Sequence, residues 1–301
     1  MIPTEYEKYE KTVMVSVANF NPVWGDKAAT LEKIKKAVTE AAQTGSKIIA
    51  FPELALSGYE CGEEARRNHK QCSMHRELAE TIPGPSTLEL AKLTKQLDIY
   101  IILGMPEQDE TDHEILYNSV SVVGPEGILG KYRKLHIAPL PRWTEEVCFK
   151  RGNELPLFET KYGPIGVQIC ADFWVVPELS RILRLKGARL LFNCTAAQTS
   201  PSRAESMTQI TACRSRENAI YAASANLVGT ERTLSYHGHS TIVGPGYPSD
   251  TQVFVQGGEQ EEIVTATLSF ESLHESWSIA DVKKLRHSEL ILNEFSKLEG
   301  K

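Results

Sequence analysis

The stretch KIIAFPE, residues 47–53, decides the fold, because a short apolar run ends there directly on a proline and a carboxylate. An apolar run of this length, followed by a turn signal, is typical of a buried strand. Residues 12–18, TVMVSVA, have the same character. Between the two runs, apolar residues recur at helical spacing from Asp26, placed as an N-cap, to Gly45, placed at the helix end. The order strand, helix, strand indicates an α/β fold.

The same alternation continues along the chain. Residues 86–89, STLE, form a capping box that predicts the start of a second helix, and residues 124–127, GPEG, predict a hairpin turn. The remaining predicted elements are strands at residues 99–104, 117–123, 164–169, 189–194, 219–225, 240–243, 252–255 and 263–268, and helices at residues 178–186 and 204–218. No linker or repeat interrupts this pattern. We therefore expect one α/β domain over residues 12–275, an N-terminal extension over residues 1–11, and a helical tail over residues 276–301 that packs on a neighbouring subunit or lies in solvent.

Charge and composition exclude several classes of protein. The 301-residue chain carries 33 Lys and Arg against 39 Asp and Glu, a formal net charge of −6, whereas a protein that binds a phosphate backbone needs a basic surface. No apolar run approaches the roughly 20 residues of a membrane helix. The first residues lack the basic and apolar regions of a secretory signal. We therefore expect a cytoplasmic protein with no nucleic-acid or membrane partner.

The sequence also predicts neither a metal nor a cofactor. Its six cysteines, at positions 61, 72, 148, 170, 194 and 213, include no CxxC pair, and their spacing fits neither a zinc site nor a small disulfide framework. Reduced and mostly buried thiols are the expectation. The dinucleotide motif GxGxxG, the P-loop and the zinc motif HExxH are all absent.

Three reactive side chains follow predicted strands. Glu53 ends KIIAFPE, Lys134 lies in GKYRKLHI, and Cys170 ends PIGVQIC. Ligands collect at the carboxyl ends of strands in open α/β sheets. A thiolate is a nucleophile, a carboxylate can accept the thiol proton, and an ammonium can stabilise charge on a carbonyl oxygen. Taken singly, each residue also has a plain structural explanation: a surface carboxylate, a solvated lysine and a small core residue.

The sequence blocks around these residues favour the catalytic interpretation over the structural one. FPELALSGY (residues 51–59), GKYRKLHI (residues 130–137) and GVQICADFW (residues 166–174) resemble, in order and spacing, the three signature blocks of the nitrilase superfamily, the carbon–nitrogen hydrolases. The resemblance extends over residues 12–264, through NCTA (residues 193–196) and a stretch that carries Arg214, Glu217 and Asn218. It implies a Glu-Lys-Cys triad at Glu53, Lys134 and Cys170. The implied fold is an α-β-β-α four-layer sandwich, which becomes eight-layered in a homodimer or larger homo-oligomer.

The resemblance also implies a mechanism. Cys170 attacks an amide carbonyl, and the oxyanion lies between the Lys134 ammonium and the backbone N–H of Ala171. A second glutamate, Glu145, fits the family spacing to Phe149 and Gly152 and is expected to orient the lysine, although the adjacent Glu146 is an alternative match. Asp172 is expected to cap backbone N–H groups at a helix entry.

The implied substrate is a small linear amide or N-carbamoyl amine, hydrolysed with water, because Cys170-Ala171-Asp172 resembles the amidase branches rather than the C-W-E of nitrilases. The candidate substrate contacts are Tyr59, Trp143, Phe173, Trp174, Asn193 and Thr195. A nitrile hydrolase, an acyl transferase with the same triad and a catalytically silent interaction protein remain alternatives. The segment between Cys170 and Pro177 is one residue longer than is common in the family, so the pocket loop is expected to differ.

Overall fold

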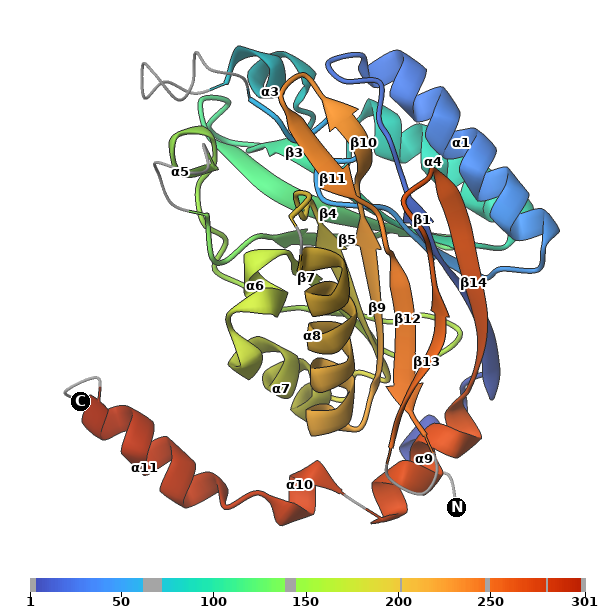
Figure 1. Cartoon of the computed structure of the whole chain (residues 1–301), viewed down its shortest axis with the longest axis vertical. Helices are drawn as coiled ribbons and strands as arrows, with labels where there is room; N and C mark the ends of the chain where they lie inside the picture. Colours follow the sequence, from blue (N-terminus) through green and yellow to red (C-terminus); the bar gives the residue numbers. More distant parts are fainter. Residues whose placement is uncertain are drawn as a thin grey trace.

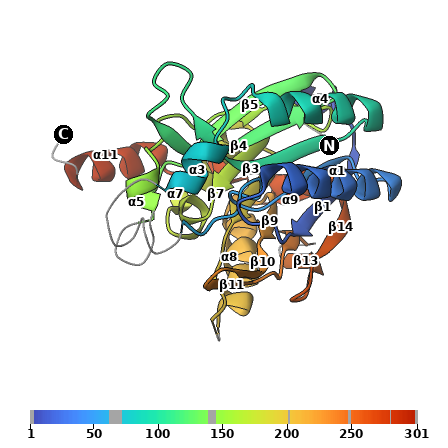
Figure 2. The same ribbon diagram turned by 90° about the horizontal axis from the view of Figure 1, so that it is seen from above.

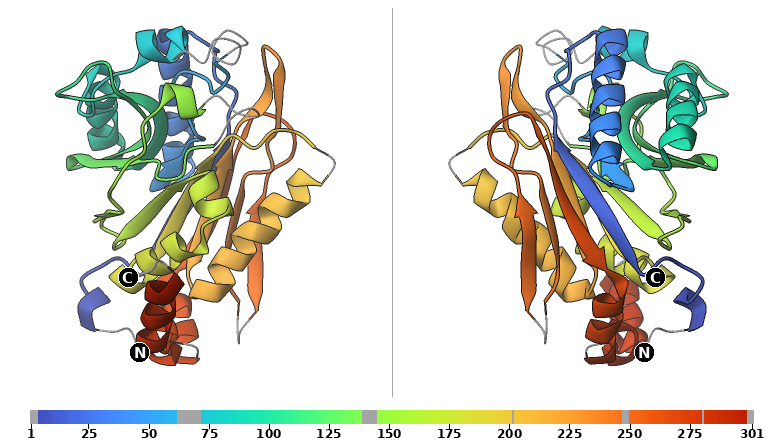
Figure 3. Two further views of the ribbon diagram at one scale, coloured as in Figure 1. Left: turned by 90° about the vertical axis from the view of Figure 1, so that its left-hand side faces the viewer. Right: turned by 90° about the vertical axis from the view of Figure 1, so that its right-hand side faces the viewer.

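The protein is a four-layer sandwich in which two β-sheets face each other and helices cover both outer faces (Figure 3). The computed structural model describes residues 4–61, 72–138, 145–200, 202–246, 250–279 and 281–298. Helices α1 and α4 cover one sheet and helices α7 and α8 the other, as the view from above also shows for α1, α4 and α8 (Figure 2). The predicted α-β-β-α fold is confirmed.

The elements alternate along the chain as the sequence pattern predicts. The strands of the first sheet are β1 (Thr12–Asn19), β2 (Ile48–Ala50), β3 (Tyr100–Gln108), β4 (Leu116–Gly124), β5 (Gly127–Arg133) and β14 (Glu262–Ser269). Those of the second sheet are β6 (Leu157–Phe158), β7 (Ile165–Ile169), β8 (Leu190–Thr195), β9 (Tyr221–Asn226), β12 (Thr241–Pro245) and β13 (Thr251–Gln256), and a separate hairpin is formed by β10 (Val228–Glu231) and β11 (Leu234–His237). The helices are a 3-10 turn (Thr4–Tyr6), α1 (Lys27–Gln43), α3 (Ser73–Leu78), α4 (Pro85–Leu97), α5 (Glu145–Cys148), α6 (Ala171–Trp174), α7 (Pro177–Lys186), α8 (Arg203–Asn218), α9 (Phe270–Ile279), α10 (Val282–Leu285) and α11 (Ser288–Leu298).

Each sheet has a parallel centre and antiparallel edges. The first has the order β14-β1-β2-β3-β4-β5, with β1, β2 and β3 parallel. The second has the order β13-β12-β9-β8-β7-β6, with β7, β8 and β9 parallel. Parallel strands share the direction of their carboxyl ends, so the loops after β2, β7 and β8 open at the ends of parallel strands.

Three apolar layers hold the sandwich together. The largest lies between the sheets and includes Val15, Ile48 and Phe192, all fully buried. A second joins α1 and α4 to the outer face of the first sheet, and a third, around Leu183 and Leu191, joins α7 to the second sheet. Because the central strands are covered on both faces, they read as nearly continuous apolar runs rather than as alternating ones.

The sequence predicts one helix start correctly and misplaces another. Asp26 is the N-cap of α1, since its carboxylate accepts the N–H of Ala29 at 3.0 Å. The capping box predicted at residues 86–89 is wrong, because α4 begins at Pro85 after the N-cap Gly84. The carboxylate of Glu80, a residue outside the predicted motif, accepts the N–H of Ser86 at 2.8 Å and so takes over the capping role.

The N-terminal residues and helix α9 pack together on the main core, and two further helices follow α9. Helix α9 joins the main core through Phe270, Leu273 and Trp277, and Tyr6 packs edge-on against Trp277 with ring centroids 5.4 Å apart. Helices α10 and α11 continue beyond α9 along one end of the molecule (Figure 1) and line a groove together with α7, while Phe295 and Leu298 remain exposed. Among the described residues, no helix combines the length and apolar character needed to cross a bilayer.

Candidate active site

Three strand ends meet where the two sheets face each other. Glu53 follows β2, Lys134 follows β5, and Cys170 follows β7. The Lys134 ammonium donates to the Glu53 carboxylate, with Nζ 2.6 Å from Oε1, and both side chains are fully buried. Both residues also influence the Cys170 thiol, since the charge of Glu53 raises its pKa and the charge of Lys134 lowers it. The structure therefore brings the three predicted residues into one site.

Glu53 accepts hydrogen bonds from several directions. Besides Lys134, the side-chain amide of Asn118 donates to Oε1 at 2.7 Å, and the backbone N–H of Ala196 donates to Oε2 at 3.1 Å. Burial raises the pKa of Glu53 to about 7, although the Lys134 ammonium opposes the shift. A carboxyl group with a pKa near neutrality can both accept and return a proton under ordinary conditions.

Lys134 lies between two carboxylates. Its Nζ is also 2.6 Å from Oε2 of Glu145, which is buried, whereas Glu146 is exposed. Of the two sequence candidates, Glu145 is therefore the one that contacts the lysine. Burial on its own would lower the pKa of Lys134, but the charges of Glu145 and Glu53 raise it well above its ordinary value. The lysine therefore remains an ammonium.

Tyr59 extends this chain of hydrogen bonds. Its hydroxyl donates to Oε1 of Glu145 at 2.6 Å. Burial, and then the Glu145 charge, raise the pKa of Tyr59 well above its ordinary value, so the hydroxyl keeps its proton. The predicted substrate contact at Tyr59 is thus found to be a buried partner of Glu145, with 7% of its surface exposed.

Cys170 occupies a strained turn between β7 and α6. Its φ is 48°, a left-handed value that costs a non-glycine residue on the order of 1–3 kcal/mol. Its backbone N–H donates to the carbonyl of Cys194 at 3.0 Å and to the side-chain oxygen of Asn193 at 3.1 Å. Burial raises the pKa of the Cys170 thiol to about 12, with a further contribution from Glu53, while Lys134 opposes the shift. The resting thiol is therefore protonated.

The backbone N–H of Ala171 begins α6 and, like the first N–H groups of any helix, has no acceptor within the helix. Arg214 anchors the other end of α6, because its guanidinium donates to the carbonyls of Phe173 at 2.9 Å and Trp174 at 3.3 Å. The orientation of this short helix, and with it the N–H of Ala171, is therefore fixed at both ends.

Asp172 acts on a different segment from the one predicted. Its buried carboxylate accepts the Tyr132 hydroxyl at 2.7 Å and the backbone N–H of His136 at 2.8 Å. It also accepts the N–H of Leu135, the residue after Lys134, at 3.3 Å. The expected cap of its own helix entry is therefore wrong, and the carboxylate instead binds the chain on both sides of Lys134.

The other predicted substrate contacts fall into different surroundings. Asn193 is buried and binds the Cys170 backbone. Thr195 accepts the indole N–H of Trp174 at 3.1 Å and also interacts with the Cys170 thiol. Phe173 is fully buried in the layer between α7 and the second sheet, so it serves the core and does not border the site. Trp143 lies outside the described residues.

Two glycines allow the site segments to approach other backbone. A Cβ at Gly104 would lie 2.2 Å from the carbonyl oxygen of Pro52, directly before Glu53. A Cβ at Gly152 would lie 2.4 Å from the carbonyl oxygen of Arg133, and the Gly152 N–H donates to the Lys134 carbonyl at 2.8 Å. Only a residue without a side chain fits at either position.

Sequence reasoning missed the carboxylate pair that holds the loop after Glu53. Glu231, on β10, accepts the backbone N–H of Tyr59 at 3.0 Å and of Glu60 at 2.9 Å. In return, the Glu60 carboxylate accepts the N–H groups of Thr233 at 2.9 Å and Leu234 at 3.1 Å in the β10–β11 turn. Neither residue lies near the other in the sequence, so no local pattern reveals this reciprocal clamp.

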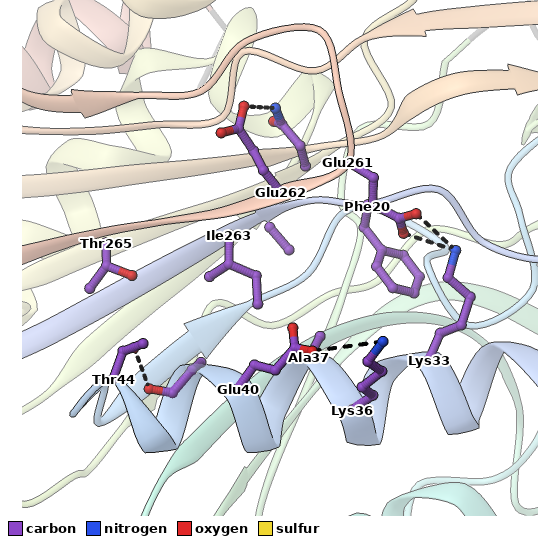
Figure 4. A pocket seen from close by; sticks show the side chains of 13 residues that line it. Phe20, Lys33, Lys36, Ala37, Glu40, Thr44, Glu261, Glu262, Ile263 and Thr265 are labelled. Carbon is purple, nitrogen blue, oxygen red and sulfur yellow. Dashed lines mark hydrogen bonds and ion pairs between the residues drawn. The ribbon is translucent and has the colours of Figure 1, made fainter.

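A groove of about 740 Å³ between α1 and β14 is separate from this site (Figure 4). Its charged residues pair with each other, because Lys33 contacts Glu261 at 2.9 Å and Lys36 contacts Glu40 at 3.8 Å. None of the residues that line it is a predicted site residue. The groove is therefore not part of the site formed at the strand ends.

Known proteins share this sequence pattern and this fold. Residues 14–276 match the family model described as carbon-nitrogen hydrolase. The chain therefore belongs to the carbon–nitrogen hydrolase family, and the predicted resemblance to the nitrilase superfamily is confirmed.

The relatives carry both nitrilase and amidase names. The chain is 37% identical over 219 residues to a probable nitrilase of Schizosaccharomyces pombe, a match that covers 71% of this chain and 74% of that protein. It is 33% identical over 278 residues to an omega-amidase of Xenopus tropicalis, covering 88% and 91%. A solved carbon-nitrogen hydrolase from Helicobacter pylori has the same fold, with a TM-score of 0.81, 21% identity, and coverage of 94% and 98%.

We expect Glu231→Gln to destabilise the protein. The amide of glutamine keeps one acceptor oxygen for the N–H groups of Tyr59 and Glu60 and the Tyr236 hydroxyl, and its NH₂ group replaces the oxygen that also accepts the Tyr59 N–H at 3.1 Å, at a cost of roughly 1–3 kcal/mol. Urea unfolding measures the loss, and Glu259→Gln, at an exposed position, is the matched control. Equal stability of the two variants would show that the clamp contributes nothing.

Proposed function

We propose that the protein hydrolyses the C–N bond of a small linear amide or N-carbamoyl amine through a thioester on Cys170. The observation that carries this proposal is the buried hydrogen-bonded chain Glu53–Lys134–Glu145, with contacts of 2.6 Å, whose charges act on a thiol in a strained turn. A scaffold without activity has no need to bury three ionisable groups beside a thiol.

In the first half-reaction, Glu53 accepts the thiol proton while Sγ of Cys170 bonds to the carbonyl carbon. The electron pair of the C=O double bond moves to oxygen, where the Lys134 ammonium and the N–H of Ala171 stabilise it. When the tetrahedral intermediate collapses, the C–N bond breaks and Glu53 returns the proton to the leaving nitrogen. Ammonia or an amine departs, and the acyl group remains on sulfur.

In the second half-reaction, water takes the place of the thiol. Glu53 accepts a proton from water as its oxygen bonds to the thioester carbon, and the same two donors stabilise the second oxyanion. The C–S bond then breaks and sulfur regains a proton from Glu53. The acid leaves and the enzyme returns to its starting state.

The amide substrate class rests on two supports. The omega-amidase of Xenopus tropicalis and the N-carbamoylputrescine amidase of tomato, 30% identical over 278 residues, are named for amide and carbamoyl substrates. Cys170 is followed by Ala171 and Asp172, as in the amidase branches. A nitrilase would use the same residues through a thioimidate, and a relative of Pyrococcus abyssi, 33% identical over 254 residues, carries that name.

We expect Cys170→Ala to abolish ammonia release from linear amides and N-carbamoyl amines, by at least about 10³-fold in kcat, because no other group forms the thioester. Ammonia is measured with the wild-type protein on a panel of amides, carbamoyl amines and nitriles. Cys213→Ala, at an exposed cysteine, is the matched control and should keep full activity. Activity that persists in Cys170→Ala, or rapid turnover of nitriles with inert amides, would contradict the proposal.

Glu145 and Glu146 should respond differently to the same substitution. Glu145→Gln leaves one acceptor oxygen for the Lys134 ammonium, the Tyr59 hydroxyl and the Ala138 N–H, all of which Glu145 now binds. We expect kcat to fall on the order of 10- to 100-fold. Glu146→Gln, on the exposed face of the same short helix, should change kcat less than about twofold. The reverse ranking, measured in the same ammonia assay, would assign the role to Glu146.

The pH dependence of kcat/KM should follow Glu53. Its pKa, raised to about 7 by burial, means that the carboxylate form needed to accept the thiol proton forms as pH rises through that value. We therefore expect kcat/KM to increase between about pH 5.5 and pH 8, and to fall by about tenfold per pH unit on the acid side. Circular dichroism at each pH separates this effect from unfolding. A flat profile over that range would exclude Glu53 as the base.

A further inference from the structure

A second cluster of reactive groups lies next to the site but takes no part in the proposed mechanism. It consists of Cys61, Cys72 and His75, whose ligand atoms all lie within 4.8 Å of one another, together with Cys148. Sγ of Cys61 is 3.1 Å from Nδ1 of His75 and 3.3 Å from Sγ of Cys148. We call these four residues the sulfur cluster. Cys72, His75 and Cys148 are buried.

The orientation of His75 is fixed from outside the cluster. Its Nε2 lies 2.9 Å from the backbone carbonyl oxygen of Gly58. A carbonyl oxygen only accepts hydrogen bonds, so Nε2 carries a hydrogen and, in the neutral ring, Nδ1 presents its lone pair to the cysteines. Histidines that bind metals almost always donate their second N–H to a carbonyl or carboxylate in this way.

We propose that the sulfur cluster binds one Zn²⁺ ion, with the three cysteine sulfurs and Nδ1 of His75 as its four ligands. Three sulfurs and one imidazole nitrogen form a Cys₃His set, which is typical of structural zinc. With Zn–S bonds of about 2.3 Å and a Zn–N bond of about 2.0 Å, tetrahedral ligand atoms lie roughly 3.5–3.8 Å apart. The 3.1 Å and 3.3 Å separations need only a small outward movement to reach that geometry.

The binding step balances simply. Three thiols release their protons, the neutral imidazole contributes a lone pair, and Zn²⁺ becomes a complex with a net charge of −1. Sequence spacing predicts no metal here, because Cys148 stands 87 residues beyond Cys61 and only the fold brings the two sulfurs together. A disulfide between Cys61 and Cys148 is the competing outcome. It would use two of the four groups and would give no role to the Nδ1 lone pair that His75 presents to the cysteines.

The ion would connect the segments that carry two site residues. Cys61 follows Tyr59 by two positions, and Cys148 lies one helical turn after Glu145 on α5. His75 is on α3, which lies at the same end of the molecule as α5 (Figures 1 and 2). The imidazole ring of His75 packs against the ring of Phe149 at a centroid distance of 5.1 Å. The zinc would therefore be a structural ion that holds Tyr59 against Glu145. Only this positioning role rests on the proposed function.

Metal analysis of the purified full-length protein tests the proposal. After expression with added zinc and purification under reducing conditions, we expect about one zinc per chain in the wild type and in Cys213→Ser, the matched control at an exposed cysteine. The double variant Cys72→Ser/Cys148→Ser should retain at least about tenfold less zinc. Its ammonia release should also fall, because α5, which carries Glu145, loses its link through the metal to Cys61 and His75.

A second measurement does not depend on the folding of the variant. X-ray absorption at the zinc edge of the wild type should show sulfur neighbours at about 2.3 Å and one nitrogen neighbour, and Co²⁺ exchanged for zinc should give the visible bands of tetrahedral cobalt thiolate. Wild-type protein without bound zinc after reconstitution, zinc with only oxygen and nitrogen neighbours, or a Cys61–Cys148 disulfide found by mass spectrometry under reducing purification would overturn the proposal. Zinc binding with intact clusters but no amidase activity would reject the proposed function alone.

Discussion

The whole site depends on the burial of one ammonium group between two carboxylates. Lys134 contacts Glu53 and Glu145 at 2.6 Å, and none of the three side chains is more than 3% exposed. An ion removed from water costs several kcal/mol unless partners compensate it, so the buried ammonium requires the carboxylates and each carboxylate requires the ammonium. The cluster still carries one excess negative charge, which neutral donors stabilise: the Asn118 amide, the Tyr59 hydroxyl and the N–H of Ala196. These donors come from both halves of the sandwich, so the electrostatics of the site and the packing of the two sheets depend on each other.

The same burial sets the state of the thiol. Cys170 has a pKa raised to about 12 and Glu53 a pKa raised to about 7, so at rest the proton stays on sulfur. A thiol is a poor nucleophile and resists oxidation better than a thiolate does. In the proposed mechanism, reactivity arises only when Sγ of Cys170 bonds to a bound carbonyl carbon and Glu53 accepts the thiol proton in the same step. In that mechanism Lys134, whose pKa is raised well above its ordinary value, stays charged and stabilises the oxyanion without taking part in proton transfer.

The layers and the strand ends could be predicted from sequence, because they depend on patterns that are local. The apolar runs within residues 12–18 and 47–53 predict buried strands, and the three family blocks identify Glu53, Lys134 and Cys170 as site residues. What could not be predicted depends on contacts between distant segments. Glu80 caps α4 from outside the helix, Phe173 turns into the core rather than toward the site, and Glu60 and Glu231 meet across 171 residues. Neither periodicity nor spacing in the sequence predicts such contacts, because they form only when the two sheets pack together.

The reciprocal clamp between Glu60 and Glu231 has an evolutionary consequence. Each carboxylate holds the backbone of the segment that carries the other, so a change of length in one segment removes hydrogen-bond donors from the carboxylate on the other. An insertion into the β10–β11 turn, for example one that alters substrate preference, would move away the N–H groups that donate to Glu60. The backbone segment that carries Tyr59 would then be held less firmly. A paired change in both segments, or a change in a loop that the clamp does not reach, avoids this loss of hydrogen bonds.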